Sequence, residues 1–292
     1  MKILDGGFGR ELARRGAPFR QPEWSALALT EAPDIVKEVH LDFIRAGAEV
    51  ITTNNYAVVP FHIGQDRFDK EVKDLVQVAV NQAKLAIIES SQKVLLAGCL
   101  PPLFGSYRAD LFKQDEAKKL ATPIIETLSP HVDFWLAETQ SCIEEVETVH
   151  ALLPDDGRDF WVSFTLQDEI QQEKPLLRSG ESIEQVAELL KRLKVNAVLF
   201  NCCQPEVILQ AILEIKKLLP DNIQIGAYAN AFPPQNSEAT ANDGLDEVRA
   251  DLNADLYLKF AQEWQAAGAT LIGGCCGIGP EHISALSKFF KQ

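Results

Sequence analysis

The chain has 292 residues, of which 46% are hydrophobic and 24% charged, and this composition suits one large or two ordinary globular domains. Its formal net charge of −14 argues against a surface for nucleic acid or anionic membrane, because such surfaces need clustered lysine and arginine. The start, MKILDGG, lacks the apolar run of a signal peptide, and no later apolar run reaches the roughly 18 residues of a membrane span. We therefore expect a cytoplasmic protein that binds neither nucleic acid nor membrane.

Short apolar or β-branched runs recur along the chain and predict strands. There are eight of them, at residues 3–4, 50–53, 94–98, 134–137, 160–164, 197–200, 223–227 and 270–272. Helical patterns lie between them, so strand and helix alternate along the chain. Eight such units in a chain of this length predict a (β/α)8 TIM barrel, with residues 1–292 as a single domain. The alternative is a doubly wound open sheet, which needs fewer strands and usually a GxGxxG turn that DGGFG does not supply.

Start and stop signals accompany several of the predicted helices. The predicted capping boxes and helix-ending glycines are Ser141 with Glu144, Ser182 with Gln185, Gly47 and Gly268. Pro123 lies inside a helical run and predicts a helix start or a kink. The proline-containing residues 231–244 are predicted to form one long loop.

Polar residues follow most of the predicted strands. They are Asp5-Gly6-Gly7, Thr52-Thr53-Asn54, Cys99, Glu138-Thr139-Gln140, Asn201-Cys202-Cys203, Tyr228-Ala229-Asn230 and Gly274-Cys275-Cys276. In a TIM barrel the carboxyl ends of all strands meet at one mouth, where active sites lie. These residues are therefore expected to converge.

The cysteines suggest a metal centre at that mouth. There are six: Cys99, Cys142, Cys202, Cys203, Cys275 and Cys276. In a reducing cytosol they are not expected to form a disulfide framework. Gly273, Gly274 and Gly277 relax the backbone, so the two thiols of the eighth strand can turn toward one point, and the sixth strand brings another. Three thiolates without an obvious fourth protein ligand describe a catalytic zinc site that is open to substrate.

Simpler explanations exist for the same residues. The cysteine pairs could be small core residues, and Asp5, Glu138 and Asn230 could be helix caps or loop hydrogen-bonding groups. A lone histidine is usually structural, so neither His40, which falls in the middle of a helix, nor His62 is predicted as a ligand. Tryptophans are core residues by default.

A family resemblance extends almost from end to end. It is carried by the stretches LDGGFGRELARRG, PEWSALAL, VKEVHLDFIRAGAEVITTNNY, Glu138-Thr139, WVSFTLQD, LFNCC and LIGGCCG. With these the chain resembles the homocysteine S-methyltransferases, a family of zinc-thiolate barrels. The resemblance implies one zinc per chain, with Cys202, Cys275 and Cys276 as ligands and Cys203 pointing away from the metal.

The resemblance also implies a site for homocysteine. Asp5 and Glu138 match the acidic positions that hold the substrate ammonium, and Thr53 with the Gly6 backbone matches the region that receives its carboxylate. Asn201, directly before the strand-six ligand, is counted with this substrate-binding set. The implied reaction is methyl transfer to the homocysteine thiolate, which gives methionine.

The sequence departs from the family at positions that bear on the identity of the methyl donor. Tyr228-Ala229-Asn230 stands where S-methylmethionine-dependent members have a Tyr-Pro-Asn-like segment, and Gly277 stands where they have arginine. A sulfonium needs no general acid, so we expect S-methylmethionine first and S-adenosylmethionine second. The rings of Trp24, Tyr56 and Tyr228 are the predicted contacts of that cation.

Other donors, acceptors and functions stay open at this level. Betaine is also a cation, and a selenol is a chemically close acceptor. A thiol-redox or structural zinc barrel and a non-catalytic binding subunit are the alternatives outside methyl transfer.

Overall fold

Eight parallel strands form one sheet in the part of the chain that the computed structural model describes, residues 1–168, 174–235 and 247–291. The strands are β1 Lys2–Ile3, β2 Val50–Thr52, β3 Leu95–Leu100, β4 Phe134–Gln140, β5 Phe160–Phe164, β6 Ala197–Asn201, β7 Gln224–Tyr228 and β8 Leu271–Ile272. Their order in the sheet is β1-β8-β7-β6-β5-β4-β3-β2. β6 and β8 are thus separated by a single strand.

The sheet closes between β1 and β2. Leu4 and Val50 form a parallel bridge there, and the Asp5 N–H donates to the Val50 carbonyl at 3.0 Å. The Glu49 N–H donates to the Ile3 carbonyl at 2.7 Å on the other side of the bridge. These bonds join the two outer strands of the sheet order, so the predicted (β/α)8 barrel is confirmed and the open-sheet alternative is wrong.

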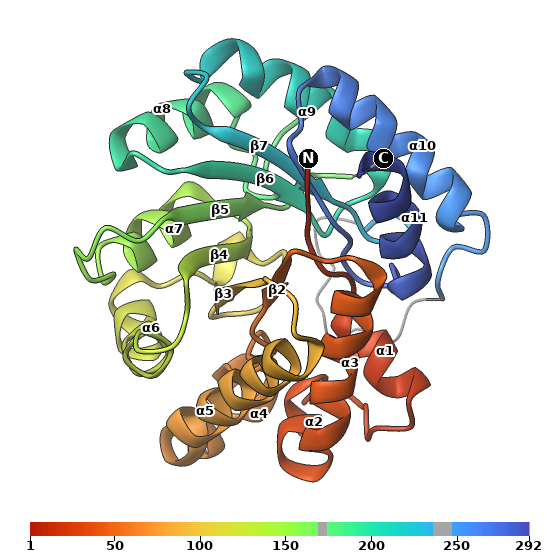
Figure 1. The fold of residues 1–292 in the computed structure, drawn as a ribbon. Helices are drawn as coiled ribbons and strands as arrows, with labels where there is room; N and C mark the ends of the chain where they lie inside the picture. The colour runs from red at the N-terminus through yellow and green to blue at the C-terminus, as the bar shows by residue number, and fades with distance from the viewer. Residues whose placement is uncertain (169–173, 236–246, 292) are drawn as a thin grey trace.

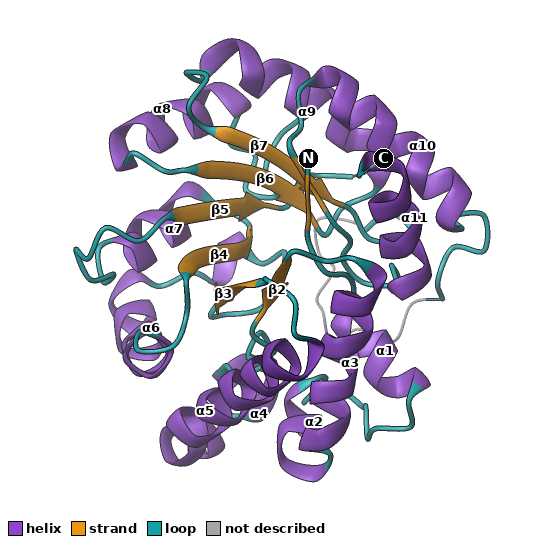
Figure 2. Cartoon of the chain, in the orientation of Figure 1, coloured by secondary structure: helices purple, strands orange, loops and turns teal. Residues whose placement is uncertain are grey.

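Helices surround the strands on the outside (Figures 1 and 2). They are α1 Phe8–Arg14, α2 Ala26–Glu31, α3 Pro33–Ala46, α4 Pro60–Ile63, α5 Gln65–Ser90, α6 Gln114–Leu128, α7 Ile143–His150, α8 Ile183–Leu193, α9 Pro205–Leu218, α10 Ala254–Ala267 and α11 Pro280–Phe290, with a 3₁₀ turn η1 at Ala109–Leu111. Each strand is followed by a helix, which is what a parallel sheet requires of its connections. None of the described helices is both long and apolar enough to cross a membrane.

Most of the predicted helix signals are confirmed. Gly47 and Gly268 end α3 and α10 in the left-handed conformation, with φ of 108° and 118°. The Ser182 side chain accepts the Gln185 N–H at the start of α8.

One predicted signal is misplaced, and one of the two alternatives for another is wrong. The predicted Ser141–Glu144 box is wrong, because α7 is capped at Cys142 and Glu145 is therefore the third helical residue. The carboxylate of Glu145 accepts the N–H groups of Ser141 at 2.6 Å and Cys142 at 3.3 Å. Pro123 does not start a helix, because α6 begins at Gln114 and runs through it, and the alternative of a kink at Pro123 stays a prediction. Of the predicted loop at 231–244, residues 236–244 lie outside the described residues.

Four strands extend beyond their predicted ends, β3 by two residues, β4 by three, and β6 and β7 by one residue each. Cys99 lies inside β3, one residue before its end, and Glu138 and Thr139 lie inside β4. The ladder between β4 and β5 shifts register between Ala137 and Gln140, and Thr139 there has a φ of 58°. This irregularity lets β4 stay paired while it carries polar side chains into the mouth.

Alternating strand residues divide the core into two layers. One set fills the barrel interior and includes Phe134, Leu136, Trp161 and Leu199, while the residues between them pack outward against the helices. Trp135, Trp161 and Trp264 are buried, as expected for tryptophans.

We expect Leu199→Ala to lower the free energy of unfolding by about 2–5 kcal/mol, because it empties part of the barrel interior. Urea unfolding followed by circular dichroism measures the change. Leu213→Ala is the matched control, since Leu213 lies on α9 with 38% of its surface exposed and should lose much less. Equal losses in the two variants would contradict the interior position of Leu199.

Candidate metal centre and substrate pocket

Three cysteine thiols meet at the mouth of the barrel. Cys202 directly follows β6, and Cys275 and Cys276 follow β8. Their sulfur atoms all lie within 4.8 Å of one another, and the Cys275 and Cys202 sulfurs are 3.0 Å apart. Sequence positions 73 residues apart are thus brought into direct contact by the parallel strand order.

Close backbone approaches hold the β8 thiols in place. The Gly274 N–H donates to the Asp5 carbonyl at 2.9 Å, and the Cys275 N–H donates to the Ala229 carbonyl at 2.8 Å. A Cβ atom on Gly274 would lie 2.2 Å from Ile278 Cγ2. Gly277 has a φ of 81°, so glycine is needed there for its conformation and at Gly274 for space.

The three sulfurs fit a thiophilic metal ion. A tetrahedral zinc at about 2.3 Å from each sulfur separates the sulfurs by about 3.8 Å, which small side-chain adjustments here would reach. Hydrogen bonds from Cys202 and Cys275 lower the pKa of Cys276 well below its ordinary value, so one thiolate is already favoured. A zinc or similar ion is therefore chemically suited to this group.

The other three cysteines take no part in it. Cys203 is fully buried in the outer core layer, where burial raises the pKa of its thiol. Cys142 caps α7. The Cys99 thiol donates to the Glu138 carboxylate at 3.2 Å.

A cavity of about 190 Å³ opens beside the thiols, and the described residues place two carboxyl groups in its wall, those of Asp5 and Glu138. Burial raises the pKa of Asp5 well above its ordinary value, although its carboxylate accepts the Thr52 N–H at 2.8 Å. Burial also raises the pKa of Glu138 to about 7. Two poorly solvated carboxyls in one small cavity favour a cationic partner.

Two of the three remaining predicted substrate residues line this cavity. Gly6 and Thr53 line it, but the Thr53 hydroxyl donates to Asn55 at 2.6 Å and accepts the Cys99 N–H at 3.0 Å. Asn201 lies outside the wall that the described residues form. Its amide joins neighbouring strands, accepting from Ser163 at 2.6 Å and donating to Thr139 at 2.7 Å.

Aromatic rings form a large part of the remaining wall, together with small, polar and aliphatic residues. The predicted residues Trp24, Tyr56 and Tyr228 all line the cavity. The cavity is also lined by four aromatic rings that the sequence did not predict and by a histidine that was excluded as a ligand. The rings are Phe8, Phe19, Tyr107 and Phe232, and the histidine is His62. All of them lie in segments that follow strands β1, β2, β3 and β7, so the rule that barrel sites are built from these connections could have flagged them.

His40 and Asn230, two further polar residues considered from the sequence, make structural contacts. His40 is buried in α3 and packs against Phe8, with ring centroids 4.5 Å apart. The Asn230 side chain accepts the Phe232 N–H at 3.2 Å within its own loop.

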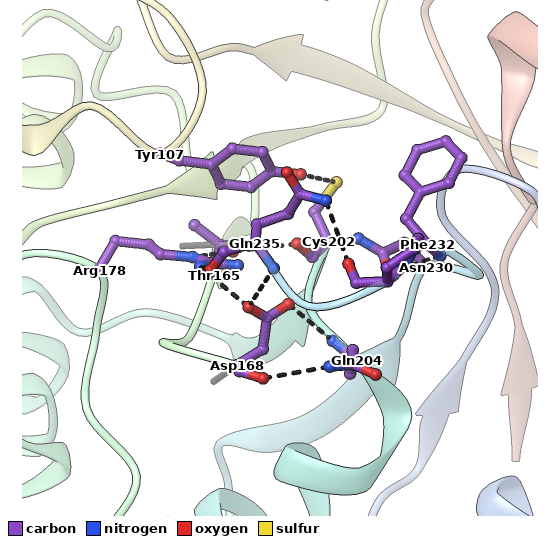
Figure 3. A network of polar contacts seen from close by, with 10 residues as sticks. Tyr107, Thr165, Asp168, Arg178, Cys202, Gln204, Asn230, Phe232 and Gln235 are labelled. Carbon is purple, nitrogen blue, oxygen red and sulfur yellow. Dashed lines mark hydrogen bonds and ion pairs between the residues drawn. The ribbon is translucent and has the colours of Figure 1, made fainter. Parts of the chain in front are cut away.

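A buried ion pair lies beside the turn that carries Cys202 (Figure 3). Asp168 and Arg178 are 3.0 Å apart, and Asp168 also accepts the N–H groups of Gln204 and Gln235. Because Gln204 lies two residues after Cys202, this pair fixes the turn that presents the Cys202 thiol.

A larger cavity, about 850 Å³, lies on the outside of the barrel against α5 and α6. Phe68, Phe104 and Leu120 are among its lining residues, and none of the predicted site residues is. The smaller cavity at the mouth is therefore the candidate site.

Known proteins resemble the chain over nearly its whole length. The sequence model described as homocysteine S-methyltransferase matches residues 2–290. The homocysteine S-methyltransferase of Escherichia coli K12 is 32% identical, over 97% of this chain and 93% of that protein. The selenocysteine Se-methyltransferase of Brassica oleracea var. italica is 29% identical, over 98% and 88%. The crystal structure of the metallated homocysteine methyltransferase MmuM from Escherichia coli superposes with a TM-score of 0.79 at 29% identity, covering 99% of this chain and 96% of that one.

We expect Gly7→Ala to disturb the thiol group, because its Cβ would lie 2.4 Å from the Cys275 carbonyl oxygen. The free energy of unfolding should fall by about 1–3 kcal/mol and metal retention should fall with it. Gly16→Ala is the control: its φ of 80° makes alanine unfavourable too, but nothing lies within 4 Å. Urea unfolding and metal analysis check both, and metal loss in Gly16→Ala alone would be inconsistent with this packing.

Proposed function

The chain belongs to the homocysteine S-methyltransferase family, and we propose that it transfers a methyl group from a sulfonium donor, S-methylmethionine first, to the thiolate of L-homocysteine, giving methionine. The observation that carries this proposal is the group of three thiols that opens onto a cavity with two buried carboxyls and aromatic walls. It joins a metal-binding group to a surface that suits cationic ligands.

The metal in this proposal is one zinc per chain, held by Cys202, Cys275 and Cys276. Sulfur ligands favour zinc among common cellular metals, and a relative is known in a metallated form. Zinc bound there would keep the homocysteine sulfur as a thiolate near neutral pH, where a free thiol with a pKa near ~8.5 is mostly protonated.

Homocysteine would enter with its amino-acid group at the acidic end of the cavity. The carboxylates of Asp5 and Glu138 would hold the ammonium, and the Gly6 backbone and Thr53 region would receive the carboxylate. The Thr53 hydroxyl already donates a hydrogen bond to Asn55, so Thr53 would only shape this end of the cavity. Asn201 would act indirectly, by joining the strands that carry Glu138 and Cys202.

The donor would lie against the aromatic wall. A ring face attracts a cation by roughly 0.5–2 kcal/mol, and Trp24, Tyr56 and Tyr228 offer such faces. S-methylmethionine is the smaller of the two sulfonium donors, and it is therefore placed before S-adenosylmethionine. Betaine is the main competitor, because it is also a small cation.

The reaction itself asks for no proton from the chain. A carbon–sulfur bond forms between the homocysteine thiolate and the methyl carbon as the bond from that carbon to the sulfonium breaks. The leaving group is a neutral thioether, so S-methylmethionine would yield methionine from both donor and acceptor. The residues of the chain need only bind, align the two sulfurs and exclude water.

A donor panel tests this proposal directly. Zinc-loaded protein is incubated with homocysteine and S-methylmethionine, S-adenosylmethionine, betaine or methyltetrahydrofolate, and methionine is measured. We expect turnover with S-methylmethionine above all others. Turnover with betaine or the folate and with neither sulfonium would overturn the donor assignment. Selenocysteine is included as an acceptor because one relative carries that activity in its name.

The zinc ligands are tested by substitution. We expect Cys275→Ala and Cys276→Ala to lose the zinc, since two thiolates and water bind it poorly. Cys203→Ala should keep both zinc and activity because Cys203 faces the core. Full zinc by elemental analysis in either of the first two variants would refute the assignment. Zinc loss in Cys203→Ala but not in Cys202→Ala would move the β6 ligand by one residue.

The ammonium site is tested by neutral substitutions of its carboxylates. We expect Asp5→Asn and Glu138→Gln each to weaken homocysteine binding by roughly 10-fold to 100-fold while zinc stays bound, because each removes a charge-assisted hydrogen bond. Calorimetric titration measures the affinity. Glu188→Gln, which changes an exposed carboxylate on α8, is the control. Unchanged affinity in both site variants would place the amino-acid group elsewhere.

A further inference from the structure

The segment that follows β3 crosses the mouth and places Tyr107 on one of the thiols. The Tyr107 hydroxyl donates a hydrogen bond to the Cys202 sulfur, with 3.3 Å between oxygen and sulfur. Tyr107 has a φ of 72°, a left-handed conformation that a residue with a bulky side chain rarely adopts. Such a conformation persists only where the surroundings hold it, and it commonly marks a functional position.

The ring of Tyr107 is held by a buried cation. The guanidinium carbon of Arg178 lies 4.7 Å from the ring centroid, and the Arg178 side chain is only 3% exposed. Arg178 is anchored in turn, because its Nη1 atom is 3.0 Å from Asp168 and donates to the Gln235 carbonyl at 2.9 Å. Figure 3 shows Arg178 reaching under the Tyr107 ring toward Asp168.

The same ion pair also holds the acceptor. Asp168 accepts the Gln204 N–H at 3.3 Å, and its own carbonyl accepts from the Gln204 side chain at 3.1 Å. The Thr165 hydroxyl donates to the Cys202 carbonyl at 3.2 Å. Cys202 itself has a φ of 53°. Donor and acceptor, 95 residues apart in sequence, are therefore fixed against each other by one buried network (Figure 3).

We propose that Tyr107 is a positioning residue of the metal centre, whose hydroxyl, held by Arg178 and Asp168, orients the Cys202 sulfur and draws charge from it. This inference rests on the proposed zinc at the three cysteines. Three thiolates on a dication leave an excess negative charge of about one, and hydrogen bonds to ligand atoms are a common way in which proteins orient and tune such ligands. Tyr107 differs in this from Tyr56, whose hydroxyl bonds to Ser106 and not to a proposed metal ligand.

The test uses Tyr107→Phe, which keeps the ring over Arg178 and removes only the hydroxyl. Zinc affinity is measured by competition with a chromophoric chelator, and the sulfur-to-cobalt charge-transfer band is recorded after cobalt(II) replaces zinc. We expect zinc binding to weaken by roughly 10-fold or more, the usual effect of losing such a partner. The cobalt band should move to lower energy, because the Cys202 lone pairs are no longer stabilised by the hydrogen bond.

Tyr56→Phe is the matched control. The Tyr56 hydroxyl lies in the same cavity wall but bonds to Ser106 at 2.6 Å, so its removal should leave zinc affinity and the cobalt band unchanged. Equal effects in the two variants would overturn the proposal, and so would a Tyr107→Phe protein with wild-type affinity and spectrum.

Arg178→Gln tests the same hydrogen bond by removing the cation that holds the Tyr107 ring. It also replaces Tyr107→Phe as the test if that variant does not fold. We expect it to shift the cobalt band in the same direction, and the Arg178→Gln, Tyr107→Phe double variant to show no further shift. If the cobalt-band shifts of the two single variants add in the double variant, Arg178 does not act through the Tyr107 hydroxyl. If Arg178→Gln shows no shift, Arg178 has no role in this hydrogen bond. Wild-type protein that binds neither zinc nor cobalt would instead refute the proposed zinc site, and this inference with it.

Discussion

Three sulfurs within 4.8 Å of one another can be ionised together only if a cation lies among them, and the mouth of this barrel is organised around that constraint. Without the cation, the thiols share protons: Cys276 is favoured as thiolate, while its hydrogen bonds with Cys202 and Cys275 keep protons on its neighbours. A site that binds a dication tightly must nevertheless hold these sulfurs together beforehand. The close glycine contacts after β8 and the strained turn after β6 accomplish this.

The electrostatics of the rest of the cavity follow from the ligands that it is proposed to bind. Homocysteine brings an ammonium and the donor brings a sulfonium, so two positive groups must lie near one negatively charged metal-thiolate centre. Asp5 and Glu138 are buried where a carboxyl on its own would rather be protonated. Placing a cation between them restores the charged form, which makes ammonium binding and carboxylate ionisation mutually dependent.

Rigidity around the centre comes from polar networks and not from the apolar core alone. The Asn201 amide ties β6 to β4 and β5, and the Asp168–Arg178 pair ties the connections after β5, β6 and β7. A buried ion pair is a weak source of stability, because desolvation offsets most of its attraction. The pair fixes geometry instead, because Asp168 holds Arg178 and also accepts N–H groups from the connections that follow β6 and β7.

The sequence by itself determined the barrel, the meeting of the thiols, and the acidic end of the cavity. These depend on local patterns: strand and helix periodicity fixes the alternation, and the alternation places every strand-end residue, such as Asp5 or Cys275, on one rim. Local patterns failed where an error of one residue matters. They placed the cap of α7 one residue too early, and they placed Cys99 beyond β3, which in fact includes it.

Only the tertiary structure decided how the rim is joined together. Nothing near Tyr107 in sequence indicates that its hydroxyl meets Cys202, and nothing near Asn201 indicates that its amide bonds to Ser163 and Thr139. Such contacts join residues from different β-α units, and they depend on strand register and on the path of each connecting loop. Periodicity carries no information about either, because it reports which face of an element is buried and not which side chain lies opposite.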